Sequence, residues 1–167
     1  MTPVLIVTFL VALQRLGELV IARRNTSRLL AAGAVEHGVG HYPLIVLLHA
    51  AWLVTLPLVV AADRWPDPFL LAFFLVLQAL RVWVLLTLGE RWTTRIITLE
   101  GAPPVRHGPY RFVRHPNYLI VVLEFAALPL AFGAWLHALV FSALNAALLL
   151  LLRIPAENRA WASAPRR

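Results

Sequence analysis

Five long apolar stretches dominate this sequence and limit the folds that are open to it. They cover residues 3–22, 44–62, 69–88, 118–132 and 135–152. An α-helix needs about 20 apolar residues to cross the hydrocarbon core of a bilayer, and each of the first three stretches has about that length. The fourth stretch is shorter, and only Gly133 and Ala134 separate it from the fifth, which predicts a tight helical hairpin. The pattern therefore predicts an all-α polytopic membrane protein with about five transmembrane helices.

The overall composition supports the same fold class. Of the 167 residues, 60% are hydrophobic and 14% are charged, and the mean hydropathy is +0.77. A soluble domain is about half apolar and about a quarter charged, so the composition excludes an ordinary soluble globule as well as a disordered or collagen-like chain. The absence of cysteine excludes disulfides, thiolate metal sites and cysteine nucleophiles. We interpret residues 1–167 as a single integral membrane domain with polar segments at 89–117 and 153–167.

The distribution of arginine predicts the orientation in the membrane. All 15 basic residues are arginine, and the net charge is +7. Segments 23–43, 89–117 and 153–167 carry three, five and four arginines, whereas the alternate connections contain only Arg64. Because positive charge is enriched on the cytoplasmic side, we expect the N-terminus outside and the C-terminus in the cytoplasm, in a bacterial inner membrane. Membrane lipids, and not nucleic acid, are the expected partners of these arginines.

The densest polar segment, residues 106–118, lies immediately before the fourth apolar stretch. Pro116 disfavours helical geometry at His115 and suits the first turn of a helix, so Asn117 and Tyr118 are expected to begin one. The free N–H groups of such a helix start attract a carboxylate or a phosphate. The alternative interpretation is a basic loop that only holds lipid headgroups.

A second polar cluster follows the last apolar stretch. Arg153 and Glu157 are four residues apart, so they share one face if the helix continues through Pro155. The alternative is an arginine that extends to the headgroups and forms a weak surface ion pair. Because one polar cluster precedes the predicted hairpin and the other follows it, both are expected on the same face of the membrane.

Four charged residues interrupt the apolar stretches themselves. Arg15 and Glu18 are expected to form a local pair, because they lie three residues apart. Arg81 and Glu124 either pair between helices or line a polar cavity, since an unpaired charge in a membrane is costly.

Four histidines are candidate metal ligands by residue type. His49 and His137 lie alone within apolar stretches and are expected to be hydrogen-bonded packing residues. His37 and His41 have a spacing typical of metal ligands, but no suitable third ligand lies near them in the sequence, so we expect no metal site.

The polar motifs together resemble a known enzyme family. The sequence Gly-Pro-Tyr-Arg-Phe-Val-Arg-His-Pro-Asn-Tyr at 108–118, a short apolar stretch, a hairpin, and then Arg153 and Glu157 are similar to the isoprenylcysteine carboxyl methyltransferase family. The N-terminal elements Arg15-Leu-Gly-Glu18 and His41-Tyr-Pro43 resemble a bacterial subgroup associated with O-methylation of polyketide alkylpyrones. The resemblance implies an integral membrane enzyme that uses S-adenosylmethionine as methyl donor.

The resemblance also implies roles for individual residues. Arg153 matches the position that faces the substrate, and we expect it to hold an anionic oxygen there. Many family members carry two consecutive acids in the C-terminal motif, and this chain has Asn158 at the second position. The residues that the resemblance places against the cofactor are Val105, Tyr110, His115, Pro116, Asn117, Tyr118 and Glu157.

The predicted function is therefore S-adenosylmethionine-dependent O-methylation of an enol or carboxylate on a lipophilic substrate, with an alkylpyrone as the first expectation. Such an oxygen is already anionic at neutral pH, so the enzyme needs alignment and exclusion of water more than a general base. Two alternatives remain open at this point. One is an NADPH-dependent membrane reductase of sterol-like lipids, and the other is a non-enzymatic membrane scaffold or transporter.

Overall fold

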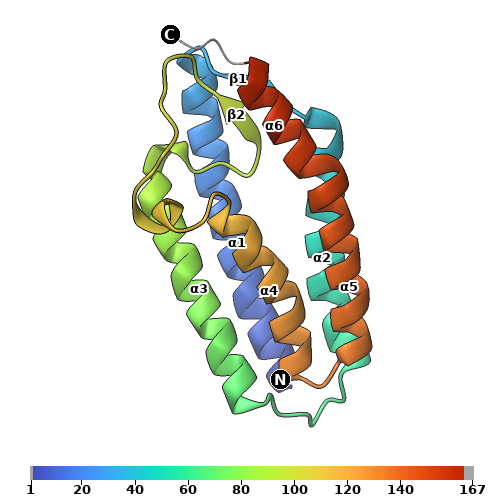
Figure 1. Cartoon of the computed structure of the whole chain (residues 1–167). Helices are drawn as coiled ribbons and strands as arrows, with labels where there is room; N and C mark the ends of the chain where they lie inside the picture. The colour runs from blue at the N-terminus through green and yellow to red at the C-terminus, as the bar shows by residue number, and fades with distance from the viewer. Residues whose placement is uncertain (1, 164–167) are drawn as a thin grey trace.

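The computed structural model describes residues 2–163 and shows a bundle of long helices that run roughly side by side (Figure 1). Among these residues, four helical segments are long and apolar enough to cross a membrane, and a fifth, α4, is shorter. The predicted all-α polytopic membrane fold is confirmed. The helices are α1 (Pro3–Ala31), α2 (Tyr42–Val59), α3 (Pro68–Leu88), α4 (Pro116–Ala131), α5 (Trp135–Leu148) and α6 (Ile154–Ser163).

The first helix is longer than its apolar stretch predicts. We expected a span at 3–22, but α1 continues through the polar residues that follow and ends at Ala31. Its 29 residues give a length of about 44 Å, against about 30 Å for the hydrocarbon core. The last turns of α1 therefore extend past the apolar region, where they reach the polar loops.

The predicted hairpin between the last two apolar stretches is present. Helices α4 and α5 are separated by Phe132, Gly133 and Ala134, and Gly133 adopts a φ of +74° that favours glycine. Consequently the segment before α4 and the segment after α5 lie at the same end of the bundle (Figure 1). Two of the C-terminal arginines counted above, Arg166 and Arg167, lie outside the described residues.

A short two-stranded sheet joins two connections at this end of the bundle, and the apolar pattern did not predict it. Strand β1 (Val35–His37) pairs antiparallel with β2 (Ile96–Thr98), so that Glu36 lies opposite Ile97. Glu36 also forms an ion pair of 2.8 Å with Arg95. The sheet attaches the loop between α1 and α2 to the loop between α3 and α4.

The last helix packs against this sheet. Ala156 and Ala160 of α6 and Ile96 of β2 form a small buried cluster of their own. A π-helical turn, Leu149–Arg153, connects α5 to α6. Pro155 has no N–H to donate to the carbonyl of Leu151, and the helix widens immediately before it. The helix thus continues through Pro155, and this places Arg153 and Glu157 on one face.

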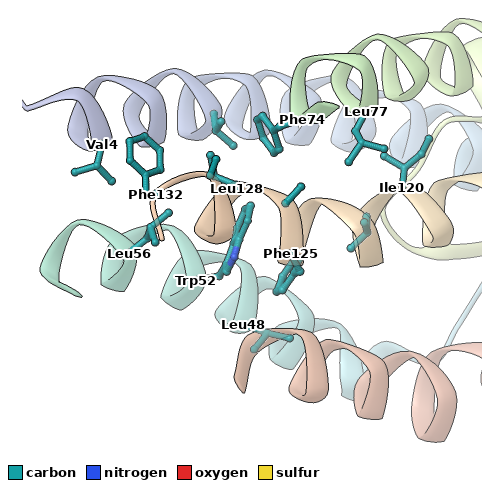
Figure 2. Packing of buried hydrophobic residues seen from close by; sticks show 14 of the residues in the cluster. Val4, Leu48, Trp52, Leu56, Phe74, Leu77, Ile120, Phe125, Leu128 and Phe132 are labelled. Carbon is teal, nitrogen blue, oxygen red and sulfur yellow. The ribbon is translucent and has the colours of Figure 1, made fainter. Parts of the chain in front are cut away.

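The apolar core lies between α1, α2, α3 and α4 (Figure 2). Its central contact is the stacking of Trp52 on Phe125, with ring centroids 4.6 Å apart and an interplanar angle of 10°. Phe74, Leu77 and Leu128 are almost completely buried around it. Many leucines, valines and phenylalanines on the outer faces are exposed, including Leu58 and Phe69. An outer surface of this kind suits contact with lipid.

Four charged side chains form one network inside this apolar bundle. Arg81 lies 2.6 Å from Glu18 and 3.4 Å from Glu124. Arg15 lies 3.1 Å from Glu18 and 2.8 Å from Glu124. Gln78 donates a further hydrogen bond of 2.8 Å to Glu124. The expected local pair of Arg15 with Glu18 is confirmed, and the pairing of Arg81 with Glu124 between helices is present as well.

The isolated histidines within the helices are hydrogen-bonded, as expected. His49 Nδ1 lies 2.8 Å from the carbonyl oxygen of Ile45, and His137 Nε2 lies 3.0 Å from Thr55 Oγ1. Outside the helices, His37 Nε2 bonds Thr98 Oγ1 across the small sheet at 2.8 Å.

Replacing Glu124 by alanine is expected to destabilise the bundle strongly. The change leaves Arg15 and Arg81 to share a single carboxylate in an apolar environment, and loss of one partner of a buried pair costs about 3–5 kcal/mol. The free energy of unfolding of Glu124→Ala in detergent measures this loss. The matched control is Glu90→Ala, which removes the exposed partner of Arg28 and should cost less than about 1 kcal/mol. Equal stability of the two variants would contradict a structural role for the network.

Candidate active site

The two polar clusters of the sequence meet at the hydroxyl group of Tyr118. Arg153 Nε donates a hydrogen bond of 3.0 Å to this oxygen, and the hydroxyl in turn donates to the carboxylate of Glu157. The ring of His115 stacks on that of Tyr118, with centroids 5.2 Å apart. His115 Nδ1 also lies 3.8 Å from Glu157 Oε2. Arg153 and Glu157 are thus bridged through Tyr118 and do not form the surface ion pair considered above.

The start of α4 explains why these side chains converge. Helix α4 begins at Pro116, and its N-cap residue His115 has φ −128° and ψ 65°, outside the helical region. A following proline disfavours the helical region at this residue, which agrees with the helix beginning only at Pro116. Asn117 and Tyr118 therefore occupy the first helical turn, as predicted, and face the π-helical turn that ends at Arg153.

A cavity of about 300 Å³ opens beside this cluster. Its size is at the lower end of the range of small-molecule and cofactor sites. Residues from the end of α1, the loop 89–117, the start of α4 and helix α6 contribute to its wall. The sheet, the α4 start and α6 therefore form one polar concavity at the end of the bundle.

The structure brings nearly all the sequence-predicted site residues to this cavity. Pro116 is the exception, because it is buried beneath the helix start and does not reach the wall. Arg91 donates a hydrogen bond of 2.7 Å to the carbonyl oxygen of Pro103, which holds the segment 102–105 against the cavity. The predicted residues on the wall are Val105, Tyr110, His115, Asn117, Tyr118, Arg153 and Glu157.

Trp92 is the most prominent wall residue that sequence reasoning missed. It is 2% exposed and lies between the cavity and the core. Asn25 of α1 donates hydrogen bonds to the carbonyl oxygens of Gly89 (3.1 Å) and Trp92 (2.9 Å), so the extended end of α1 holds this turn in place. The asparagine among the arginines that follow the first apolar stretch was the only sequence signal for this contact.

A second, smaller cavity of about 100 Å³ lies deeper in the bundle. Helices α2, α3, α4 and α5 all contribute to it, through residues that include His49, Arg81 and Asn145. Arg81 therefore pairs with Glu124 and also lines a cavity, one whose wall is mostly apolar. The two cavities share a wall made of Trp92, Thr93, Asn117, Tyr118 and Arg153.

Tyr110, in the wall of the larger cavity, is kept neutral by its surroundings. Burial raises the pKa of the Tyr110 hydroxyl to about 12, and the nearby carboxylate of Glu157 acts in the same direction. A raised pKa means that the phenol retains its proton at neutral pH. Tyr110 therefore acts there as a neutral hydrogen-bonding and stacking surface.

The chain is similar to two bacterial proteins whose names give no function. Over 151 residues the chain is 37% identical to the uncharacterized protein YpbQ of Bacillus subtilis, covering 88% of this chain and 89% of the relative. It is 29% identical over 115 residues to an uncharacterized protein of Haemophilus influenzae, covering 65% of this chain and 66% of that protein. No solved structure gives a significant match.

The match to a protein family covers most of the residues that line the two cavities. Residues 70–163, from α3 through α6, match the isoprenylcysteine carboxyl methyltransferase (ICMT) family. The matched region contains the bridge through Tyr118 and the whole wall that the two cavities share. The fold, the site and this match together establish that the chain belongs to the ICMT family of membrane methyltransferases.

Proposed function

We propose that this protein is an S-adenosylmethionine-dependent O-methyltransferase of a lipophilic enol or carboxylate. The resemblance of its N-terminal elements to a bacterial subgroup makes a long-chain alkylpyrone the first candidate acceptor. Residues 1–167 act as a single catalytic domain in this proposal. S-adenosylmethionine supplies an electrophilic methyl group on a sulfonium ion, and this chain's residues bind and align the two reactants.

The observation that carries the proposal is the wall shared by the two cavities. Methyl transfer is an in-line displacement, so the donor and the acceptor must face each other across a short gap. The larger cavity is lined by polar loops, and the smaller one lies within the bundle. A polar donor in the first and the head group of a lipophilic acceptor in the second would meet at Tyr118, Asn117 and Arg153.

The wall of the larger cavity fits the donor chemically. Asn117 Oδ1 is buried and has no hydrogen-bond partner among the described residues, so it is free to accept from an ammonium or amino group. The Glu157 carboxylate supplies negative charge near a sulfonium or an ammonium. Arg114 and the start of α4 suit a carboxylate. Tyr110 offers a neutral aromatic face to a nucleobase.

The anionic oxygen of the methyl acceptor needs a cation that keeps its charge throughout the reaction. Arg153 is 8% exposed, and it lines both cavities. A guanidinium does not lose its proton in a protein, so Arg153 would hold an anionic oxygen without acting as a base. In this proposal Tyr118 fixes the direction of Arg153 through the bond to its Nε, and the apolar bundle excludes water from the reaction.

In this proposal the site lies at the boundary between the hydrocarbon core and the lipid headgroups. Helix α4 has 16 residues and a length of about 24 Å, shorter than the hydrocarbon core. In this proposal its first turn lies where the acyl region meets the headgroups, because it belongs to the end of the bundle that carries the polar loops. The arginines favour the cytoplasmic side of a bacterial inner membrane for this end, where S-adenosylmethionine is available.

Glu157→Gln is expected to weaken S-adenosylmethionine binding by about 10- to 100-fold. The change removes the negative charge while preserving shape and leaves the Tyr118 hydroxyl only a neutral amide oxygen as acceptor, and hydrogen bonds to charged groups contribute about 1.5–3 kcal/mol. The dissociation constant of labelled S-adenosylmethionine with the detergent-solubilised protein measures it. Glu90→Gln, an exposed acid at the same end, is the control and should bind as the wild type does. Protection of the wild type by NADPH and not by S-adenosylmethionine would favour the reductase alternative.

Tyr110 is expected to remain protonated well above the pH at which an ordinary tyrosine ionises. Because its pKa is raised to about 12, removing it should not change the tyrosinate absorbance between pH 9 and about pH 11. The difference in absorbance at 295 nm between the wild type and Tyr110→Phe, recorded against pH, tests this. An absorbance difference that develops near pH 10 would contradict the buried, acid-facing position of the hydroxyl.

The proposed orientation is testable because the chain has no cysteine. In inverted and right-side-out membrane vesicles, a membrane-impermeant maleimide should label His107→Cys only from the cytoplasmic side. Asp63→Cys, in the connection between α2 and α3, should react only from the opposite side. Labelling of both positions from the same side would contradict the topology.

A further inference from the structure

One buried polar group of the smaller cavity is not explained by folding. Asn145 of α5 is 3% exposed and lines this cavity. Its Nδ2 has no hydrogen-bond acceptor among residues 2–163. A buried amide without a partner costs about 1–3 kcal/mol, and the cost is not relieved in a helix that faces lipid. A leucine of similar shape would satisfy packing at this position.

The position of Asn145 relative to Arg153 suggests what the amide serves. Both residues line the same cavity, Arg153 in the wall shared with the larger cavity and Asn145 outside that wall. An asparagine NH₂ group donates hydrogen bonds and carries no charge, whereas a guanidinium carries a permanent charge. Arg81 also lines the cavity, but Glu18 and Glu124 pair with it. The cavity thus presents a cationic donor at Arg153 in the shared wall and a neutral donor at Asn145.

The remaining wall and the volume limit the shape of the ligand. Ile45, Val121, Leu148 and Leu149 supply an apolar surface between the two donors. The volume of about 100 Å³ is of the order of the roughly 150 Å³ cavity that accommodates a benzene ring. A small flat ring that lies partly inside the cavity, with oxygens at two positions, suits these features, and a long hydrocarbon chain does not fit inside.

We propose that Asn145 determines the specificity for the methyl acceptor by donating a hydrogen bond to a second, neutral oxygen of its head group. The anionic oxygen of the same head group would lie at Arg153, and the hydrocarbon tail would extend into the lipid. This inference rests on the proposed methyltransferase function and narrows its acceptor to ring enols that also carry a carbonyl or ether oxygen. A site built to bond an oxygen rejects analogues that lack it.

The test uses 4-hydroxy-6-undecyl-2-pyrone as acceptor and labelled S-adenosylmethionine as donor, with the full-length protein in detergent. Asn145→Leu removes the donor and preserves shape, so kcat/KM for the pyrone should fall about tenfold, mainly through KM. The dissociation constant of S-adenosylmethionine should not change. Because the unpaired amide is gone, the ligand-free variant should unfold about 2–4 °C higher than the wild type.

Ser142→Ala is the matched control. Its hydroxyl is also buried on α5 without a partner among the described residues, but it does not line the cavity. This variant should keep the kinetic constants of the wild type. Asn145→Ala, which removes the donor by truncation, provides a second variant in case the leucine disturbs folding, and it should show the same rise in KM.

The outcomes separate this inference from the proposed function. An unchanged KM in both Asn145 variants, or an equal loss of S-adenosylmethionine affinity, would overturn the role of Asn145 and leave the methyltransferase proposal intact. A wild type that binds S-adenosylmethionine but methylates only simple fatty acids would overturn the assignment of a two-oxygen acceptor. Absence of S-adenosylmethionine binding to the wild type would overturn both.

Discussion

The ion-pair network of Arg15, Glu18, Arg81 and Glu124 constrains how this bundle packs. Each charge is costly in an apolar environment unless it is paired, so α1, α3 and α4 must align where all four side chains meet. This alignment fixes the depth of α4. Its first turn then lies beside Trp92 and the turn that Asn25 holds, where the polar end of the bundle begins.

The bridge through Tyr118 also holds helices in position, at the polar end of the bundle. It connects the start of α4 to the continuous helix that follows the hairpin, and it holds an arginine and a glutamate in fixed directions. Arg153 and Glu157, the two residues that this bridge joins, lie 35 and 39 residues after Tyr118 in the sequence. The start of α4 carries these polar side chains, whereas the rest of the helix packs into the apolar core.

Three of the buried polar atoms that have no partner among the described residues belong to side chains that line the cavities. Asn117 Oδ1 and Trp92 Nε1 are buried in the shared wall without protein partners among the described residues, and Asn145 Nδ2 is buried in the smaller cavity in the same way. Folding alone would select against such groups, since each lowers the free energy of unfolding. A ligand bound in the cavities would supply partners to these three groups.

The sequence by itself determined the helical membrane fold, the hairpin and the helix start at Pro116, because segment length, hydropathy and proline geometry act locally along the chain. It also determined that the two polar clusters lie on one face, since a hairpin returns to the side from which it starts. Only the tertiary structure decided that Arg15 and Arg81 share both glutamates, that Tyr118 joins Arg153 to Glu157, and that Trp92 and Asn145 line the cavities. Those contacts depend on how the helices rotate and slide against one another, and no local periodicity encodes that packing.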